Sequence, residues 1–523
     1  MSSSRPSDHY DSPEPIAQPR LGVGGYLRFF WRQLTSMRTA LFLLLLLAFA
    51  AIPGSLVPQR SSDPNGVVQY AAKYPDLYGV LDWFGVFNTY SSVWFSAIYL
   101  LLFVSLIGCV IPRTRHHFIA LRARPPKTPA RLERLAAFTS RETEADAATA
   151  IETATALLKK QGYRVELYGD SVSAERGYLR ETGNLVFHTA LIGVLVTVGI
   201  GGGFGYTGQR VVVEGYAMTN TLASYDSFNP GRFFSGESLD PFRIALDEFT
   251  VRYELQNENA IGQATKFTAS VTTTEPGSDP KKAEIKVNSP LEIGGSQVYL
   301  LGNGYAPTLI VRDPDGNVVW TDSVPFLPQD ANLTSVGVVK VPDGLAEQVG
   351  MVGFFYPTAA ETPSGALTSG YPDLVIPLLT LRVYTGDLGL NEGEPRSVYS
   401  LDVATLTEVA GSDADVAALE LSPGETVDLP NGLGTIEFTD VKRFASLDIH
   451  HDPSQLWVLG FALLVVAGLL TSLFIPRRRV WVKVVGQRLE YAGLARGEDP
   501  TLESAVEGLA NSHAAALSLR LKP

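Results

Sequence analysis

The sequence predicts a membrane protein with four transmembrane helices, a large β-rich, β-sandwich-like extracytoplasmic domain between helices 3 and 4, and a small α+β cytoplasmic domain between helices 2 and 3. Three observations predict this architecture. Four segments lack charged residues over about the 20 residues that a helix needs to cross a bilayer. The long stretch between the last two segments alternates apolar and polar residues, which is typical of strands. Lysine and arginine gather in the flanks expected on the cytoplasmic side.

The four apolar segments set the expected transmembrane helices at residues 38–58, 92–112, 185–206 and 454–476. A cleavable secretory signal is the alternative interpretation of the first segment. However, 38 residues precede the apolar run, and IPGSLVPQR follows it in place of a small-residue cleavage site. We therefore expect the first segment to stay in the membrane.

The basic residues around these helices predict that both chain termini are cytoplasmic. Arginine recurs before the first helix, whereas the loop after it contains only Arg60 and Lys73. Seven basic residues follow the second helix within residues 113–134, and three arginines at 477–479 follow the fourth. Every flank agrees with the same orientation, which is that of a multi-pass membrane protein with both termini in the cytoplasm.

Three segments outside the helices and domains complete this topology. Residues 1–37 are expected to form a cytoplasmic, basic and disordered segment, and residues 477–523 a cytoplasmic tail. Residues 59–91 form an external loop whose aromatic residues suit the outer membrane interface. These residues are Tyr74, Tyr78, Trp83, Phe84, Phe87 and Tyr90.

Residues 113–184 predict a basic linker followed by a small α+β unit. Apolar residues recur at helical spacing over about 144–161, and Gly162 is placed to cap the end of that helix. YRVELYGDSVSAERG then predicts two short strands joined at Gly169-Asp170.

The extracytoplasmic segment, residues 207–453, contains successive strand patterns such as FRIALDEFTVRYE, KFTASVTTT, AEIKVN, SQVYLL, PTLIVRD and GNVVWTD. A turn is expected at Asp315-Gly316. These patterns predict a β-sandwich or a curved open sheet. No nucleophile elbow, phosphate loop or zinc motif occurs, so the sequence predicts neither a catalytic nor a metal site here.

Charge separates this domain from the rest of the chain. Residues 207–452 hold 34 Asp and Glu against 14 Lys and Arg, a net charge of −20, whereas the other residues sum to +8. An acidic domain would repel nucleic acid and anionic lipid and would favour a basic protein partner, although a merely soluble surface explains it equally well. Cys109 is the only cysteine. The domain therefore has no disulfide, and any thiol chemistry must be done by another protein.

The remaining candidates for functional residues are histidines. His9 in the N-terminal segment and His513 in a C-terminal helix are expected to be solvated, and headgroups or partner loops suffice to explain His116 and His117. His188 is different because it lies about one turn into the third apolar segment.

The sequence around His188 allows two interpretations and does not decide between them. It can be an interfacial histidine bonded to a neighbouring helix or a headgroup. It can also be a ligand or proton carrier, since a neutral imidazole has a free ring nitrogen for iron and haem can sit between helices. The small-residue run GIGGGFG beyond it would let a neighbouring helix approach closely. His450 and His451 precede the fourth segment, where they form a polar cap before Pro453 or a second ligand site.

Four stretches of the chain share their pattern with one known family. SMRTALFLLLLLAFAAIPGSLVPQ has a basic-Thr-Ala start and a Pro-Gln end, and IKVNSPLEIGGSQVYLLGNGYAP has an I-x-V-N-x-P-L strand followed by a G-x-x-x-Y strand. ETGNLVFHTALIG and GFALLVVAGLLTSLFIPRRRVWV contain the third and fourth apolar segments. Spread from Leu34 to Val485, these stretches resemble the ResB-type (CcsB-like) cytochrome c biogenesis proteins of the system II pathway.

The resemblance implies a subunit of a cytochrome c synthase that acts with a CcsA/ResC-type membrane partner. Together they would move haem across the membrane and join it to the CxxCH motif of apocytochrome c, with a thioredoxin-like protein as a further partner for thiol reduction. The tryptophan-rich haem-handling loop belongs to the partner, and this chain has six tryptophans without a cluster. The chain would then be an accessory, non-catalytic subunit, with His188 as an axial ligand of a transient haem shared with the partner.

Other functions are weighed against this one. A membrane-anchored receptor or scaffold ectodomain explains the β-rich domain but predicts no haem. A transporter is disfavoured, because four helices without paired broken segments make a poor alternating-access machine. A stand-alone enzyme is disfavoured, because no catalytic constellation occurs in the sequence.

Overall fold

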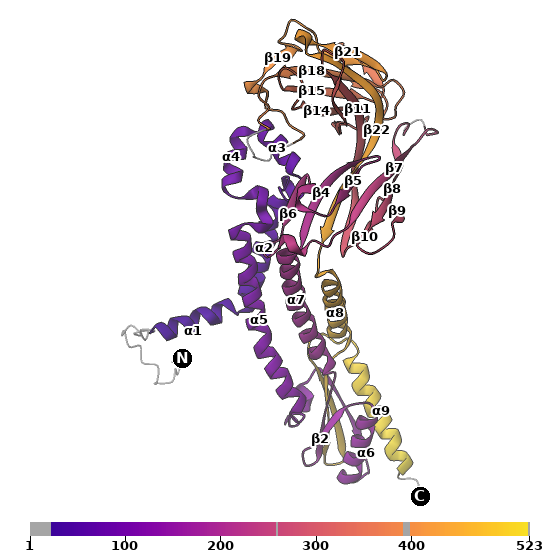
Figure 1. The fold of residues 1–523 in the computed structure, drawn as a ribbon. Helices are drawn as coiled ribbons and strands as arrows, with labels where there is room; N and C mark the ends of the chain where they lie inside the picture. The colour runs from indigo at the N-terminus through magenta and orange to yellow at the C-terminus, as the bar shows by residue number, and fades with distance from the viewer. Residues whose placement is uncertain (1–21, 258–259, 391–397, 521–523) are drawn as a thin grey trace. The chain divides into compact units, whose positions relative to one another are not determined.

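The computed structural model describes residues 22–257, 260–390 and 398–520 (Figure 1). The chain divides into two compact units, one made of Met1–Val198 with Leu456–Pro523 and the other of Gly199–Gln455. Each unit is described by itself.

Within the described residues, four helices are long and apolar enough to cross a membrane: α2 (Met37–Leu56), α5 (Val93–Arg122), α7 (Leu179–Phe204) and α8 (Gln455–Phe474). The sequence predicted all four, and two of the helices extend beyond the predicted membrane-spanning segments. Helix α5 continues ten residues past position 112, and α7 begins six residues before position 185. The apolar run marks only the part of a helix that is suited to lipid. The backbone hydrogen bonds of the helix continue into polar sequence until a cap or a turn ends them.

The expectation of disorder over residues 1–37 is wrong for its second half. Residues Val23–Leu34 form helix α1, and Thr35 and Ser36 turn the chain into α2. The Ser36 hydroxyl accepts a hydrogen bond from the backbone N–H of Thr39, which caps the start of α2. Residues 1–21, including His9, lie outside the described residues.

The predicted external loop is helical. It contains α3 (Pro64–Lys73), α4 (Pro75–Trp83) and the 3₁₀ turn η1 (Val86–Ser91). Its aromatic residues divide into two groups. Phe87 is fully buried, with the rings of Tyr70 and Tyr78 packed on it, whereas Trp83 is 81% exposed. The segment therefore builds a small core of its own and leaves only part of its aromatic surface for a membrane interface.

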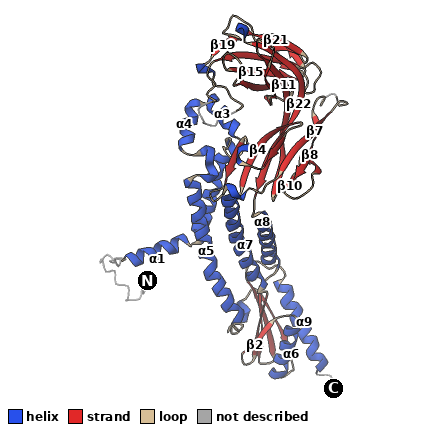
Figure 2. Cartoon of the chain, viewed as in Figure 1, coloured by secondary structure: helices blue, strands red, loops and turns tan. Residues whose placement is uncertain are grey.

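The α+β domain contains β2, α6 and α9 (Figure 2). Its five-stranded antiparallel sheet has the order β1-β24-β23-β3-β2. The predicted helix and hairpin are present as α6, β2 and β3. The C-terminal segment is no tail, because strands β23 and β24 fill the middle of this sheet and α9 packs with α6 on one of its faces. The elements are β1 (Ala137–Glu142), α6 (Ala147–Lys160), β2 (Arg164–Leu167), β3 (Ser171–Arg176), β23 (Arg478–Val485), β24 (Arg488–Ala495) and α9 (Leu502–Arg520).

The β domain is organised around two long strands, β11 (Ser296–Arg312) and β22 (Gly434–His451), which pair along their whole length (Figure 1). The stretches SQVYLL and PTLIVRD, expected as two strands, both belong to β11, which has register shifts against β22 at Leu300/Gly302 and Thr308/Leu309. Such irregularities bend a strand without ending it. The expected turn is present, with Gly316 at φ +87° between β11 and β12.

These strands form the middle of a seven-stranded sheet that contributes to two hydrophobic cores. Around Ile449 and Val298 the sheet packs against a four-stranded sheet, β5-β7-β8-β9. Around Phe438 and Leu309 it packs against a six-stranded sheet that contains β13-β14-β15-β18-β19 and β20. The expected sandwich is thus two sandwiches that share one sheet, which explains how a domain of this size is held without disulfides.

The remaining strands of the β domain have these bounds: β4 (Tyr206–Val213), β5 (Ala217–Thr219), β6 (Ser227–Pro230), β7 (Arg243–Tyr253), β8 (Ala264–Thr274), β9 (Lys281–Lys286), β10 (Leu291–Ile293), β12 (Val318–Ser323), β13 (Leu327–Pro328), β14 (Ser335–Val341), β15 (Val349–Tyr356), β16 (Ala359–Glu361), β17 (Leu367–Ser369), β18 (Leu378–Thr385), β19 (Thr407–Ala410), β20 (Leu419–Leu421) and β21 (Glu425–Leu429).

Candidate functional site

His188 lies on α7, and its imidazole is held in one tautomer. Its Nδ1 is 2.7 Å from the carbonyl oxygen of Asn184, one helical turn earlier. A carbonyl oxygen only accepts hydrogen bonds, so Nδ1 carries the proton and Nε2 keeps a free lone pair. Nε2 has no hydrogen-bond partner among the described residues. The ring is half-buried, with the Phe187 ring edge-on at 4.9 Å between centroids.

Two contacts between α5 and α7 bracket the position of His188 along the bundle. Tyr99 donates a hydrogen bond to the carbonyl of Leu195 at 2.5 Å, and His117 Nε2 lies 3.0 Å from Thr182 Oγ1. His188 lies about midway between Thr182 and Leu195. The corresponding level of α5 is near Cys109, whose thiol donates to the carbonyl of Thr35 at the turn between α1 and α2. His188 therefore lies near the end of the apolar bundle at which α2 begins.

A close contact between α7 and α8 positions the turn that holds His188. A Cβ atom on Gly468 would lie 2.6 Å from the backbone N of Phe187, so only glycine permits this approach. The glycine run farther along α7 was expected to let a neighbouring helix approach, but no helix of the described residues lies against Gly201 and Gly203. Gly201 and Gly203 contact Ser454 and Phe233 of the β domain instead.

His117 was explained from the sequence by headgroups or partner loops, but it is 8% exposed. It lines a mostly apolar cavity of about 460 Å³ between α5, α7 and α8. Its Nδ1 is buried and has no hydrogen-bond partner. The missed signal was helical spacing, since Thr114, Phe118 and Leu121 line the same cavity on the same helix. The neighbouring His116 is exposed.

His188 does not line this cavity. On α7 the cavity is lined by Thr182, Leu185, Val186, Thr189 and Ala190. At about 100° per residue, His188 points to a different side of the helix. The two buried or half-buried bundle histidines are therefore separate candidates, and His188 is the one whose free nitrogen faces away from this chain's own cavity.

His450 and His451 are the last two residues of β22, and successive strand residues point to opposite faces of a sheet. His451 stacks on Tyr206, and its Nδ1 lies 3.0 Å from the carbonyl of Gly295. His450 Nε2 lies 2.7 Å from Asp448, and this hydrogen bond raises the pKa of His450 although partial burial opposes it. The two rings thus cannot bind one ligand together.

His513 was expected to be solvated, and that prediction is wrong. It is 0% exposed, and it lies between α9 and the sheet, 2.8 Å from Tyr491 Oη and 2.9 Å from the carbonyl of Ala150. Burial lowers the pKa of this imidazole. The α9 helix was expected in a free tail, so no sequence signal pointed to a core position.

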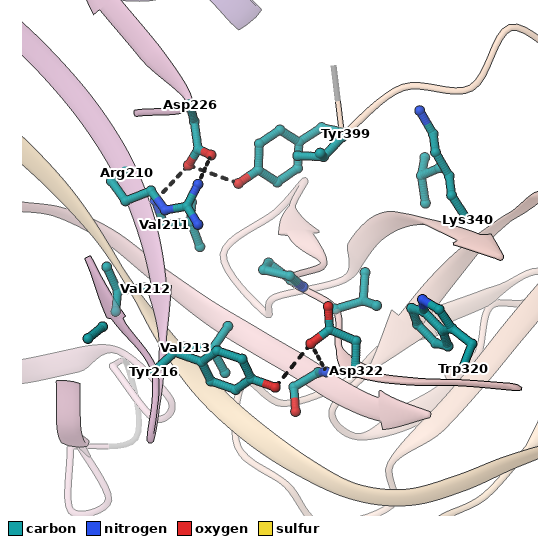
Figure 3. A pocket seen from close by; sticks show the side chains of 16 residues that line it. Arg210, Val211, Val212, Val213, Tyr216, Asp226, Trp320, Asp322, Lys340 and Tyr399 are labelled. Carbon is teal, nitrogen blue, oxygen red and sulfur yellow. Dashed lines mark hydrogen bonds and ion pairs between the residues drawn. The ribbon is translucent and has the colours of Figure 1, made fainter. Parts of the chain in front are cut away.

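The β domain has a cleft of about 340 Å³ beside β4, β12 and β14 (Figure 3). Its charged groups are already paired, because Asp226 accepts hydrogen bonds from Arg210 at 2.8 Å and from Tyr399 at 3.0 Å. Across the cleft, Tyr216 donates to Asp322 at 3.0 Å. No group of three His, Cys, Asp or Glu side chains converges to hold a metal anywhere in the described part of the chain.

Comparison with known proteins identifies what this architecture is similar to. The family model of the ResB-like family matches residues 37–507. The cytochrome c biogenesis protein CcsB of Synechococcus sp. (strain WH7803) is 25% identical over 488 residues, which cover 88% of this chain and 92% of that protein. CcsB of Synechococcus sp. (strain RCC307) is 28% identical over 484 residues, covering 88% and 91%. These relatives support a role in cytochrome c biogenesis, and the chain belongs to the ResB-like family.

Proposed function

We propose that this chain is a subunit of the system II cytochrome c synthase. It acts with a CcsA/ResC-type membrane partner in moving haem across the membrane and attaching it to apocytochrome c. The family match and the cytochrome c biogenesis names of the relatives support the proposal. Within this proposal the chain is an accessory subunit, which would supply a haem ligand and surfaces to the complex.

The observation that carries the haem role is the free Nε2 of His188. A histidine that ligates iron donates its other ring N–H to a backbone carbonyl or carboxylate, which fixes the tautomer and raises the basicity of the ligating nitrogen. The hydrogen bond from His188 Nδ1 to Asn184 has this form. The residues present thus fit an axial ligand of haem. When bound, haem supplies the iron and the vinyl groups that form thioethers with cysteine thiols.

The half-exposed position of His188 supports a site shared with the partner. An imidazole on the side of a membrane-spanning helix is costly to leave facing lipid, so another subunit or a cofactor is expected to cover it. In this arrangement His188 would hold the haem iron from this chain, and the CcsA/ResC-type partner would supply a second ligand. The glycine contact between α7 and α8 keeps the His188 turn rigid.

The membrane in this proposal is the bacterial plasma membrane, with both termini cytoplasmic and the β domain outside. The basic residues that follow α5 and α8 support this orientation. The β domain has a net charge of −20 over residues 207–452 and can attract the unfolded, often basic, apocytochrome. Because Cys109 is the only cysteine and lies in α5, thiol reduction falls to a separate thioredoxin-like protein. The acidic charge of the β domain disfavours nucleic acid as a partner.

A reporter cytochrome tests the proposed function. The chain and its CcsA/ResC-type partner are expressed with an apocytochrome c in a host that lacks its own maturation system, and covalent haem on the reporter is measured. We expect covalent haem with the wild type, a large loss with His188→Ala and no loss with His116→Ala, which changes an exposed histidine. Full maturation without this chain would contradict the proposal and favour the receptor or scaffold alternative.

A further inference from the structure

Helix α1 exposes an apolar face that the other described residues leave uncovered. Val23, Leu27 and Phe30 are 79%, 66% and 65% exposed, and no residue of the 12-residue helix is buried. A helix of this length is marginally stable in water, and Gly24 and Gly25 weaken it further. A stable α1 therefore needs a surface that covers its apolar face.

The sequence of α1 divides into two faces. At about 100° per residue, six of its apolar residues fall within roughly 140° of the circumference, and Phe29 lies about 60° beyond Tyr26. These six are Val23, Tyr26, Leu27, Phe30, Trp31 and Leu34. Tyr26 and Trp31 stand at the two borders of this face, where amphipathic rings are favoured at a membrane interface. Arg28 and Arg32 lie opposite, and α1 contains no acidic residue.

The turn at Thr35 and Ser36 joins α1 to α2 and is held against α5 (Figure 1). Ser105 of α5 donates a hydrogen bond to the carbonyl of Leu34 at 2.6 Å, and Cys109 donates to that of Thr35 at 2.9 Å. The apolar run of α2 begins directly after this turn, with Leu41 and Phe42 more than half exposed. The apolar face of α1 is thus continuous with the lipid-facing surface of a membrane-spanning helix.

We propose that α1 is an interfacial anchor that lies in the headgroup region of the membrane leaflet at which α2 begins. Its apolar face enters the upper acyl region, and Arg28 and Arg32 bind anionic phosphate headgroups. The occupant of this face is a lipid surface, because a basic polar face, border aromatics and continuity with α2 together match the chemistry of a leaflet. The anchor holds the α1–α2 turn at a fixed depth in the membrane. Because Cys109 of α5 contacts this turn, the neighbouring part of α5 is held at the same depth.

Nitroxide labels on the full chain test the anchor. In a Cys109→Ser background, which keeps a donor for the Thr35 carbonyl, single labels replace Phe30 on the apolar face or Arg28 on the polar face. The chain is placed in nanodiscs of phosphatidylcholine with phosphatidylglycerol, and accessibility to oxygen and to a water-soluble nickel complex is measured. Both positions are exposed, so neither label should disturb folding, and unchanged thermal unfolding checks this.

We expect the label at position 30 to be accessible to oxygen and shielded from nickel, and the label at position 28 to be accessible to nickel. Replacing phosphatidylglycerol with phosphatidylcholine alone should move the label at position 30 toward water, and Arg28→Gln with Arg32→Gln should abolish this lipid dependence. Equal nickel accessibility at both positions would overturn the proposal by placing α1 in water. Shielding of position 30 from both reagents would overturn it in favour of a protein contact.

Discussion

Gly183 of α7 and Gly468 of α8 lie in backbone contact, since a Cβ atom on Gly183 would lie 2.8 Å from the carbonyl oxygen of Gly468. Small residues allow this approach, and van der Waals contact then replaces the hydrophobic driving force that is weak between helices in lipid. On α7, this contact lies about one and a half helical turns before His188. It links the packing of the bundle to the orientation of the candidate ligand.

Gly468→Leu should therefore separate α7 from α8 and weaken the bundle. Overpacking at a close contact costs about 1–3 kcal/mol of the free energy of unfolding. The measurement is the midpoint of thermal unfolding of the purified chain in detergent. Gly460→Leu is the matched control, because this glycine of α8 has no atom near its Cβ position and its replacement should leave the midpoint unchanged. Equal effects of the two variants would contradict the packing role.

Arg477 and Glu175 form a buried ion pair that joins the end of α8 to the α+β sheet. Arg477 donates two hydrogen bonds to Glu175, at 3.0 and 2.6 Å, and the two side chains are 9% and 4% exposed. Burial alone would raise the pKa of Glu175, but hydrogen bonds from Tyr178 and Arg477 keep it below its usual value.

Glu175→Gln should cost about 1–3 kcal/mol, because the amide no longer balances the buried charge of Arg477, which then keeps only its ion pair with Glu181 at 2.7 Å. The more exposed pair of Glu166 with Arg124, whose side chains are 28% and 79% exposed, provides the control, and Glu166→Gln should change stability by less than about 1 kcal/mol. Hydrogen exchange of β3 and β23 amides measures both. A Glu175→Gln variant with wild-type exchange would show that the pair contributes no net stability.

His513 should make the α+β domain less stable in mild acid. Its folded pKa is lowered by burial, so below the unfolded value of about 6.5 the unfolded chain binds a proton that the folded chain does not. The free energy of unfolding then falls as pH drops from about 6.5 towards the folded pKa. Hydrogen exchange of α6 and β24 amides across this range, in the wild type and in His513→Gln, isolates the effect.

The wild type should lose protection as pH falls, and His513→Gln should lose less. His116→Gln, at an exposed position, should follow the wild type. Identical pH profiles for wild type and His513→Gln would mean that the buried imidazole does not control this domain.

The sequence predicted features that depend on local pattern. The four apolar helices, the α6 helix with Gly162 at φ +77° after its end, and the hairpin at Gly169 are all present. Features that depend on distant partners were not predictable in the same way. The segment that forms strands β23 and β24 was expected to be a cytoplasmic tail. The two strands pair with β1 and β3, which are more than 300 residues away in the chain, so no local pattern indicates their place in the sheet.

The same distinction applies to the candidate site. The position of His188 in an apolar helix was visible in the sequence, and its tautomer became visible only with the Asn184 contact. The buried position of His117 could have been inferred from its helical spacing with Phe118 and Leu121, whereas only tertiary packing shows that His513 is buried. Adjacent His450 and His451 looked like a pair, but strand geometry separates their rings.

The most direct test of the account is the visible spectrum of the chain purified together with its CcsA/ResC-type partner. The wild type should show a Soret band and reduced-haem bands, and His188→Gly should weaken or shift them. Added imidazole should restore the wild-type bands in His188→Gly, since it can replace the missing ligand, whereas His117→Gly should leave the ligation bands unchanged. A haem spectrum indifferent to His188→Gly, or no haem in the wild-type complex, would contradict the assignment of His188 as an axial ligand.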